Sequence, residues 1–209
     1  MGKITKIEVQ KRNKKRVNVY IDEEYAFSVG MEIVYKENLS KGLEVDEEKL
    51  SIIVKKENVS KCKEAALRIL DKSYKSEKEL REKLFQKEYD KYAIDQTLNF
   101  LQEYNLVNDE KYAKLYIKDR LRTQGRNKIK YSLIQKGINE DIISELLEDS
   151  DKEEEKNIAY NLANKKYLQL KKRETDTYKI KNKLSRFLIS RGYDYSLTKD
   201  IINEIVNDQ

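Results

Sequence analysis

Residues 3–29 alternate between apolar and polar side chains in three short runs. Within each run the apolar residues lie two positions apart, which places them on one face of a strand. They are Ile7 and Val9 in the first run, Val17, Val19 and Ile21 in the second, and Tyr25, Phe27 and Val29 in the third. Polar segments at 13–15 and 22–24 separate the runs as turns do. The pattern therefore predicts a three-stranded antiparallel meander.

After Gly30 the apolar residues lie three and four positions apart, which is the spacing of helices. Ile33 and Val34 indicate a short helix, and Leu50 and Val54 belong to a second helical stripe. Because strands and helices follow one another within a short length, we expect residues 1–57 to form a small α+β domain.

From about residue 59 the chain has helical spacing throughout, and a six-residue pattern occurs three times. Each copy contains leucine, an apolar or aromatic residue, a polar residue, a cation, glycine or glutamate, and an aromatic or aliphatic residue. The copies begin at Leu84, Leu133 and Leu188, which are 49 and 55 residues apart. A period near fifty with helical content indicates tandem three-helix units. The chain is thus predicted to be mainly α, with three such repeats at 58–108, 109–150 and 151–209.

Residues at the predicted helix starts have side chains suited to capping. Ser76 and Glu79 fit a capping box, in which each side chain accepts a hydrogen bond from the backbone amide of the other. Asp109 has the right side chain to be the N-cap of the second repeat.

The recurring six-residue pattern also predicts how the second helix of each repeat ends. Gly137 and Gly192 stand where a helix must stop, so we expect both in the left-handed conformation. Glu88 takes this place in the first repeat, which predicts a differently built corner or mild strain.

The composition limits the chemistry that this chain can perform. Charged residues make up 39% of its 209 residues, which favours small modules with thin cores. The sequence has no histidine, the commonest general base and metal ligand. Its single cysteine, Cys62, falls on an apolar helical stripe and is expected to be a buried thiol. Phosphate-binding loops, dinucleotide-binding motifs and Ser/His/Asp sets are absent. We therefore expect no enzyme, no cofactor and no metal site.

Uncharged stretches in this sequence are all shorter than ten residues. Such stretches are too short for a membrane span or for the core of a signal peptide. We expect a cytoplasmic monomer that does not enter membranes.

Charge is partitioned along the helical region although the whole chain has a net charge of only +6. Residues 111–136 hold nine cations and one acid, residues 140–155 hold nine acids and one cation, and residues 165–191 hold ten cations and two acids. Like charges at this density repel one another unless an anionic partner relieves the repulsion. The two basic zones, 111–136 and 165–191, are therefore candidate surfaces for phosphates or for an acidic protein face. The alternative is that they are ordinary solvated helix faces.

The candidate contact residues are fifteen of the nineteen arginines and lysines of these two zones. They are Lys118, Arg120, Arg122, Arg126, Lys128, Lys130, Lys136, Lys165, Lys166, Lys171, Lys172, Arg173, Lys183, Arg186 and Arg191. Five tyrosines lie among them and could stack on bases, although tyrosine at helical spacing is more often half-buried core. They are Tyr112, Tyr116, Tyr131, Tyr167 and Tyr178.

Four groups of residues occur in a characteristic order between about 60 and 207. The groups are Ala65, Ile69 and Leu70 followed by Ser73-Tyr74-Lys75-Ser76-Glu77; Leu106-Val107-Asn108-Asp109 with Tyr112 and Ala113; Gly125 and Arg126 with Lys128, Ile129, Leu133, Lys136, Gly137 and Ile138; and Arg191-Gly192-Tyr193. In this order and spacing the sequence resembles the RecX family, the bacterial regulators of the RecA recombinase. Residues 1–57 look like the additional domain that some members carry.

The resemblance implies a non-enzymatic protein of tandem three-helix units. Family members bind the filament that RecA forms on single-stranded DNA, lie along its groove and modulate it, usually by inhibition. The implied role is regulation of homologous recombination, DNA repair and the SOS response. Whether the protein inhibits or remodels filaments stays open, as does direct binding of single-stranded or duplex DNA without RecA.

A competing class is a helix-turn-helix-like DNA-binding transcription regulator, because three-helix units with a tight turn before the last helix resemble that fold. In the second repeat, however, the predicted last helix carries Glu140, Asp141 and Glu145. Phosphates would repel a recognition helix with this charge.

Overall fold

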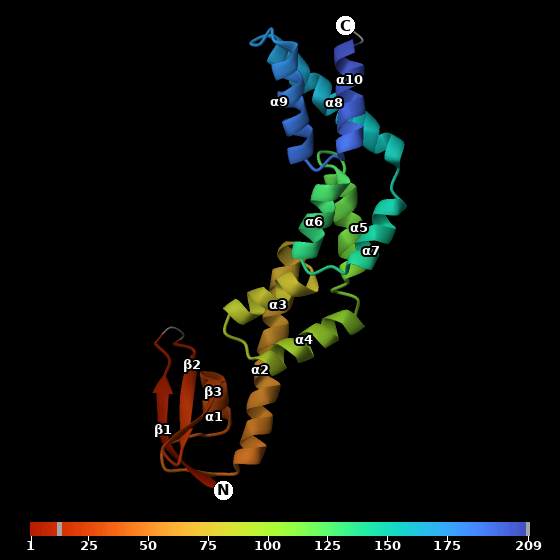
Figure 1. The fold of residues 1–209 in the computed structure, drawn as a ribbon. Coiled ribbons are helices and arrows are strands. Elements are labelled where there is room, and N and C mark those ends of the chain that lie inside the picture. The colour runs from red at the N-terminus through yellow and green to blue at the C-terminus, as the bar shows by residue number, and fades with distance from the viewer. Residues whose placement is uncertain (12–13, 208–209) are drawn as a thin grey trace. The chain divides into compact units, whose positions relative to one another are not determined.

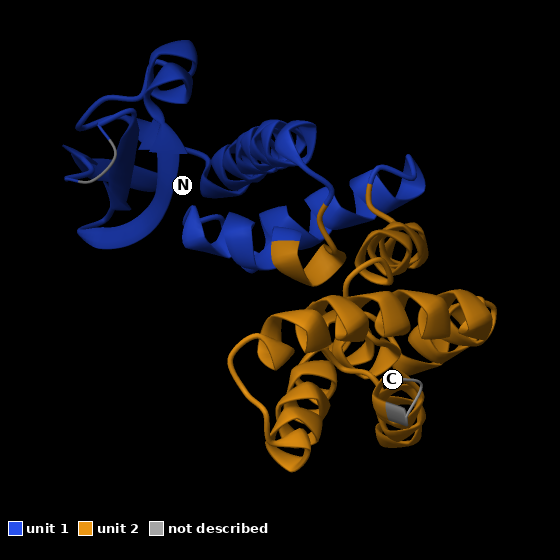
Figure 2. Cartoon of the chain, turned by 90° about the horizontal axis from the view of Figure 1, so that it is seen from above, with its two compact units in different colours: residues 1–74, 80–106 blue, residues 75–79, 107–209 orange. Residues whose placement is uncertain are grey.

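The fold is described from a computed structural model, which covers residues 1–11 and 14–207. Asn13, part of the turn expected at 13–15, lies outside these residues. The chain divides into two compact units (Figure 2). Unit 1 comprises residues 1–74 and 80–106, and unit 2 comprises residues 75–79 and 107–209.

Unit 1 begins with the predicted antiparallel meander (Figure 1). Its strands are β1 (Gly2–Val9), β2 (Arg16–Ile21) and β3 (Glu24–Gly30). A two-residue strand, β4 (Glu44–Val45), pairs with β1, so the order among the described residues is β3-β2-β1-β4. Every neighbouring pair is antiparallel.

Two irregularities in strand register alter the predicted faces. The pairing of β1 with β2 shifts between Ile4 and Lys6, so Ile4 is fully buried while Val9 is 48% exposed. A second shift, in the pairing of β2 with β3, places Tyr25 opposite Tyr20, and the Tyr25 side chain is exposed. A period of two carries no sign of such a shift, because one extra residue turns every later side chain to the other face.

Two helices follow the sheet, α1 (Met31–Lys36) and α2 (Glu47–Lys72). The helical stripe around Leu50 and the helix expected from residue 59 are parts of this one helix. Asp46 caps α2 by accepting from the amides of Glu48 and Lys49. No glycine or proline interrupts it, so the chain has no local reason to stop at 57, and the expected boundary between 57 and 58 lies inside α2.

The rest of the described chain is helical, as predicted. The helices are α3 (Glu77–Gln86), α4 (Lys91–Glu103), α5 (Asp109–Arg120), α6 (Arg126–Gln135), α7 (Glu140–Glu148), α8 (Lys152–Lys171), α9 (Thr177–Ser190) and α10 (Tyr195–Asn207). Helices α5, α6 and α7 surround one small core and α8, α9 and α10 another. Each repeat thus buries its own thin apolar stripe, consistent with the high charge content.

The three recurring sextets form the same corner. Gly137 and Gly192 have φ of +86° and +89°, as expected for left-handed helix ends. Glu88 has φ of +66° in the same place, and Tyr89 N–H donates to Leu84 O at 3.3 Å just as Ile138 does to Leu133 O at 3.1 Å. The first corner therefore keeps the geometry and carries the strain of a non-glycine residue.

Candidate partner and nucleic-acid interface

Within unit 2, the start of α3 packs against the corner between α6 and α7. Ser76 Oγ donates to Lys136 O at 2.7 Å, and Lys78 Nζ donates to Gln135 O at 3.0 Å. Ser76 and Glu79 also form the predicted capping box, with both bonds at 3.2 Å. The buried Ser76 side chain thus serves its own helix and the next repeat together.

The start of α6 packs in the same way against the corner between α9 and α10. Gly125 N–H donates to Arg191 O at 2.9 Å, and Asn127 N–H donates to Gly192 O at 3.1 Å. A Cβ on Gly125 would lie 2.5 Å from the carbonyl carbon and oxygen of Gly192. We call these two contacts the first joint (α3 with the α6–α7 corner) and the second joint (α6 with the α9–α10 corner).

In each joint a carboxylate from another helix also caps the first turn of α3 or α6. The carboxylate comes from α5 in the first joint and from α8 in the second. Asp109 accepts from Glu77 N–H at 2.8 Å, and Glu155 accepts from Arg126 N–H at 3.2 Å. The expected N-cap role of Asp109 is therefore wrong in detail, because Asn108 caps α5 and Asp109 caps α3. Burial raises the pKa of Asp109, despite the hydrogen bond from Glu77. A separation of 32 residues between donor and acceptor explains why local sequence could not show it.

Arg126, a predicted contact residue, is held inside the second joint. Its Nε donates to Glu155 Oε2 at 2.5 Å, its Nη1 to Leu147 O at 2.6 Å and its Nη2 to Ser150 O at 2.9 Å. The Glu155 side chain is only 8% exposed. A guanidinium with all of its nitrogens engaged serves the fold, so we exclude Arg126 from the proposed contact surface.

Lys136 has a similar place in the first joint. Its ammonium pairs with Glu79 and lies 5.7 Å from the ring centroids of Tyr112 and Tyr116. Burial works against the charged forms of both partners, yet the hydrogen bond between them keeps the pKa of Glu79 lowered and that of Lys136 raised. Lys136 is therefore also excluded from the contact surface.

The remaining cations of the first basic zone lie near acids, most of which the linear count did not include. Lys130 pairs with Glu140 at 3.6 Å, and Arg120 lies 3.6 Å from Asp119. Lys118 and Arg122 line a groove of about 440 Å³ together with three acids from the region around the start of α8. Those acids are Asp149, Asp151 and Glu154. Lys128 is exposed and donates to Ser190 O at 3.3 Å. Ion pairs thus offset part of the charge of this zone within unit 2.

The second basic zone keeps more of its charge. Lys183 pairs with Glu174 at 3.1 Å, Arg191 donates to Thr123 O at 3.0 Å, and Lys166 and Lys171 lie over aromatic rings. No ion pair is found within the described part of the chain for the other four predicted residues, which are Lys165, Lys172, Arg173 and Arg186. Of these, Lys165 and Lys172 lie seven positions apart on α8 and its C-cap, and so share one helix face.

The interleaved tyrosines divide into core and surface. Tyr167 is buried and Tyr112 and Tyr116 are half-buried, whereas Tyr131 and Tyr178 are exposed. Of the two exposed tyrosines, Tyr178 lies in the second basic zone, at the start of α9, where it could stack on a base.

Residues 1–11 and 14–207 contain no cluster of three histidine, cysteine, aspartate or glutamate side chains that could hold a metal ion. None of their helices is long and apolar enough to cross a membrane. Cys62 is buried, and this burial raises the pKa of its thiol.

Family models match four successive parts of the chain. The model described as "Regulatory protein RecX N-terminal domain" matches residues 2–46, and those of the first, second and third three-helix domains of RecX match residues 62–101, 108–147 and 153–202. The chain belongs to the RecX family.

Relatives and solved structures agree with this assignment. The chain is 53% identical over 209 residues to regulatory protein RecX of Clostridium perfringens strain 13, covering 100% of the chain and 99% of the relative. It is 52% identical over 206 residues to RecX of Clostridium beijerinckii, covering 99% and 97%. A crystal structure of regulatory protein RecX covers both chains fully with a TM-score of 0.67 and 27% identity.

RecX membership settles two of the expectations from sequence. The predicted class of fold, a sheet-containing N-terminal domain followed by three three-helix domains, is that of the family. RecX proteins are non-enzymatic regulators, so this chain is a regulatory protein rather than a catalyst.

Proposed function

We propose that this RecX protein binds the filament of RecA on single-stranded DNA along its groove and inhibits it. Regulation of RecA is the role that family membership implies. The observation that carries the proposal is the uneven charge of unit 2. Within the described residues no ion pair engages Lys165, Lys172, Arg173 or Arg186, whereas four predicted residues of the first basic zone (Arg120, Arg126, Lys130 and Lys136) are ion-paired.

The second joint supports this proposal because it links the second and third repeats, both within unit 2, through backbone and buried polar contacts. Several weak contacts made by one connected scaffold add up through effective concentration, even if each exposed ion pair contributes little. Glycine backbones in direct contact, as at Gly125 and Gly192, limit how far one repeat can shift against the next. We therefore propose the exposed cations of the second basic zone as the principal contact surface.

The helix-turn-helix alternative receives no support from the exposed faces of the last helices. On α7, Glu140, Asp141 and Glu145 are exposed, and on α10 Asp200 and Glu204 are exposed. Neither helix could approach a phosphate backbone without repulsion.

A charge reversal of the second basic zone tests the proposal. The variant Lys165→Glu, Lys172→Glu, Arg186→Glu should keep its helix content, because glutamate forms helix about as well as lysine and arginine. Its binding to RecA–single-stranded DNA filaments should weaken at least about tenfold, and the dependence of binding on salt should become flatter because fewer counterions are released. Fluorescence anisotropy at several salt concentrations and RecA-driven strand exchange measure both effects.

The matched control is Lys56→Glu, Lys91→Glu, Lys199→Glu, which makes the same change in net charge at exposed sites outside the zone. It should bind and inhibit as the wild-type protein does. Equal losses in both triple variants would mean that only net charge matters. Wild-type inhibition by the Lys165 triple variant would place the contact surface elsewhere.

A further inference from the structure

The last strand of the sheet in unit 1, β3, has an unpaired edge. Among the described residues β3 pairs only with β2. Met31 N–H donates to Lys15 O at 2.9 Å, which sets the alternation of hydrogen-bonded pairs along the two strands. In this alternation Val29 forms a hydrogen-bonded pair with Val17 of β2. Ser28 belongs to the next, non-hydrogen-bonded pair, so its backbone N–H and C=O point away from β2. Consistent with this direction, Ser28 O accepts from Arg16 Nη2 at 3.0 Å.

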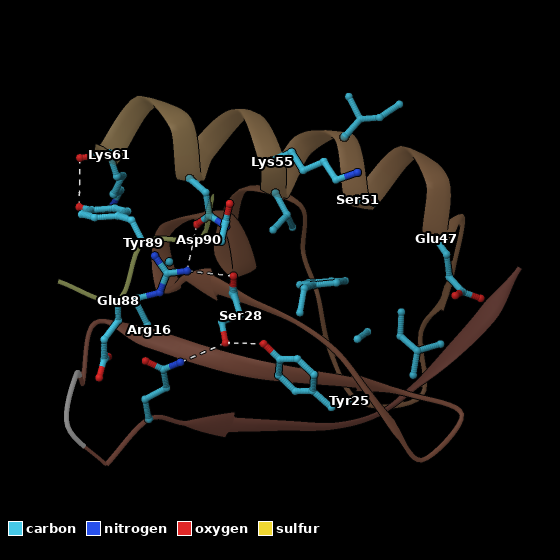
Figure 3. Close-up of a pocket in the computed structure, with 18 of the residues that line it drawn as sticks. Arg16, Tyr25, Ser28, Glu47, Ser51, Lys55, Lys61, Glu88, Tyr89 and Asp90 are labelled. Carbon is cyan, nitrogen blue, oxygen red and sulfur yellow. Dashed lines mark hydrogen bonds between the residues drawn. The ribbon is translucent and has the colours of Figure 1, made fainter. Parts of the chain in front are cut away.

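A groove of about 1030 Å³ runs along β3 and is bounded on its other side by α2 (Figure 3). Ala26, Ser28 and Gly30 line it from the strand. Glu47, Ser51, Lys55 and Asn58 line it from the helix, at the spacing of one helix face. The corner between α3 and α4 closes one end through Tyr89, whose hydroxyl donates to Lys61 O at 3.1 Å.

The two ends of the groove differ in charge. Glu47 and Glu48 lie at the end where α2 begins, and Arg16 and Lys61 lie at the opposite end. Arg16 donates to two neutral acceptors, Ser28 O and the Asn58 side chain, whereas Lys61 pairs with Glu57 and Glu32. The lining at this end holds four cations (Lys15, Arg16, Lys61 and Lys87) and two acids (Glu88 and Asp90), so cations outnumber acids there. Between the ends, Ile52 leaves 53% of its side chain exposed.

We propose that this groove binds an extended segment of a partner protein, which adds to β3 as a further strand. Backbone groups of β3 would hold the segment once Arg16 turns from Ser28 O to the acidic residue of the segment, and alternate side chains would give specificity. Because β3 has seven residues, the segment needs about six or seven. It carries an acidic residue at the Arg16 end, a basic residue at the Glu47 end and a β-branched residue against Ile52. The proposal does not depend on RecA regulation, since the groove lies outside both basic zones.

The test uses the full chain and a synthetic heptapeptide with blocked ends, Lys-Thr-Val-Ile-Val-Thr-Glu. It is titrated into the millimolar range while ¹⁵N amide shifts of the protein are followed. We expect saturable shifts in β3 and in the groove-lining face of α2. The control peptide, Thr-Val-Lys-Ile-Glu-Val-Thr, has the same composition with both charges near the centre, and it should bind about fivefold or more weakly.

Two pairs of variants locate the binding. Ser28→Pro removes the outward N–H at no cost in backbone bonds to β2 and should weaken binding at least about tenfold. Ser28→Ala keeps the N–H and should bind normally, and both variants lose the hydroxyl that donates to Asn18 of β2. Lys55→Glu places an acid in the groove and should weaken binding about fivefold, whereas Lys56→Glu, beside it on α2 but outside the groove, should not. Circular dichroism checks that Ser28→Pro is folded, and Lys55→Glu provides an independent result if it is not.

Four outcomes would overturn the proposal. The first is the absence of saturable shifts with the charged-end peptide. The second is equal affinity for the wild-type protein and the Lys55→Glu variant. The third is displacement of the peptide by oligothymidine, which would make the groove a nucleic-acid site. The fourth is a shift of the same residues with protein concentration alone, which would show that a second copy of the chain occupies the groove.

Discussion

Single glycines decide how closely the repeats of unit 2 approach one another. Gly192 has a positive φ and ends α9, as its place in the sequence predicts. Gly125 has an ordinary φ of −81°, so its conformation does not need glycine. The need comes from contact, because the backbone of Gly192 occupies the space where a Gly125 side chain would begin.

Replacement of Gly125 by alanine should therefore be costly in spite of its relaxed backbone. We expect Gly125→Ala to lower the free energy of unfolding by about 2–4 kcal/mol, because the neighbouring atoms belong to backbone and cannot rotate away. Gly42→Ala is the control. Gly42 has φ of +93° with open space around it, so its replacement should cost only about 1 kcal/mol of conformational strain. Urea unfolding of both variants measures the difference, and equal costs would contradict the close contact at Gly125.

At the scale of the element, helix starts in unit 2 are stabilised by groups from other helices. Asp109 and Glu155 accept from the amides that begin α3 and α6, and Lys136 pairs with Glu79 in the first turn of α3. Carboxylates near a helix N-terminus also interact favourably with its dipole. These contacts join one repeat to the next through the capping of helices.

The carboxylates Glu79 and Asp109 respond to pH in opposite directions. The lowered pKa of Glu79 means that its contribution is complete above its ordinary value of 4.5 and is lost as the pH falls through the lowered value. We expect Glu79→Gln to be less stable than the wild-type protein by about 1–2 kcal/mol at pH 7, with the gap narrowing as the pH falls below 4.5. Urea unfolding at pH 7 and pH 3 measures it.

Asp109→Asn is the comparison for that experiment. Because the pKa of Asp109 is raised in the folded protein, its ionisation opposes folding, and this cost is complete once the pH has risen above the raised pKa. An asparagine keeps the oxygen that accepts from Glu77 N–H and removes the buried charge. This variant should match or exceed the wild-type stability at pH 7. A gap for Glu79→Gln that stays constant between pH 7 and pH 3 would show that the ion pair with Lys136 contributes nothing.

At the scale of the whole molecule, stability is distributed over several small cores. Residues of the second and third repeats form separate clusters, each built from three helices. Helix α2 runs without a break through the expected domain boundary at 57, and its buried residues include Leu50 and Val54 in one half and Cys62 and Ala66 in the other. The domain limits 1–57, 58–108, 109–150 and 151–209 stay predictions that fragments can test.

The second joint predicts how such fragments behave. Fragment 107–209 contains two cores and the complete second joint, so it should be helical and melt in one cooperative transition. Fragment 107–150 keeps one small core but loses the partner of Gly125 and the Glu155 partner of Arg126. It should be largely unfolded at 37 °C, since a chain of this size rarely folds without added support. Circular dichroism melts compare the two. Equal midpoints would mean that repeats are independent and that the joint is not stabilising.

Local pattern was enough to predict most of the architecture from sequence. Apolar spacing predicts the meander and the helices, and the recurring sextet predicts the left-handed corners at Gly137 and Gly192, because each depends on residues within one or two turns of one another. The family assignment rests on the same local motifs. Strand register was less predictable, since the two irregularities in the sheet leave no trace in the alternation around Val9 and Tyr25.

The sequence by itself determined the helices, their corners and the family, while tertiary structure decided which cations are available to a partner. Arg126 and Lys136 stand in a segment with a single acid, and counted along the chain they look uncompensated. In the fold, Glu155 and Glu79 reach them from 29 and 57 residues away. Electrostatic energy depends on distance in space, and a helix carries each side chain to neighbours that its sequence position does not reveal. For the same reason the sequence did not predict the groove beside β3, because its two walls come together only when the strand and the helix pack in the fold.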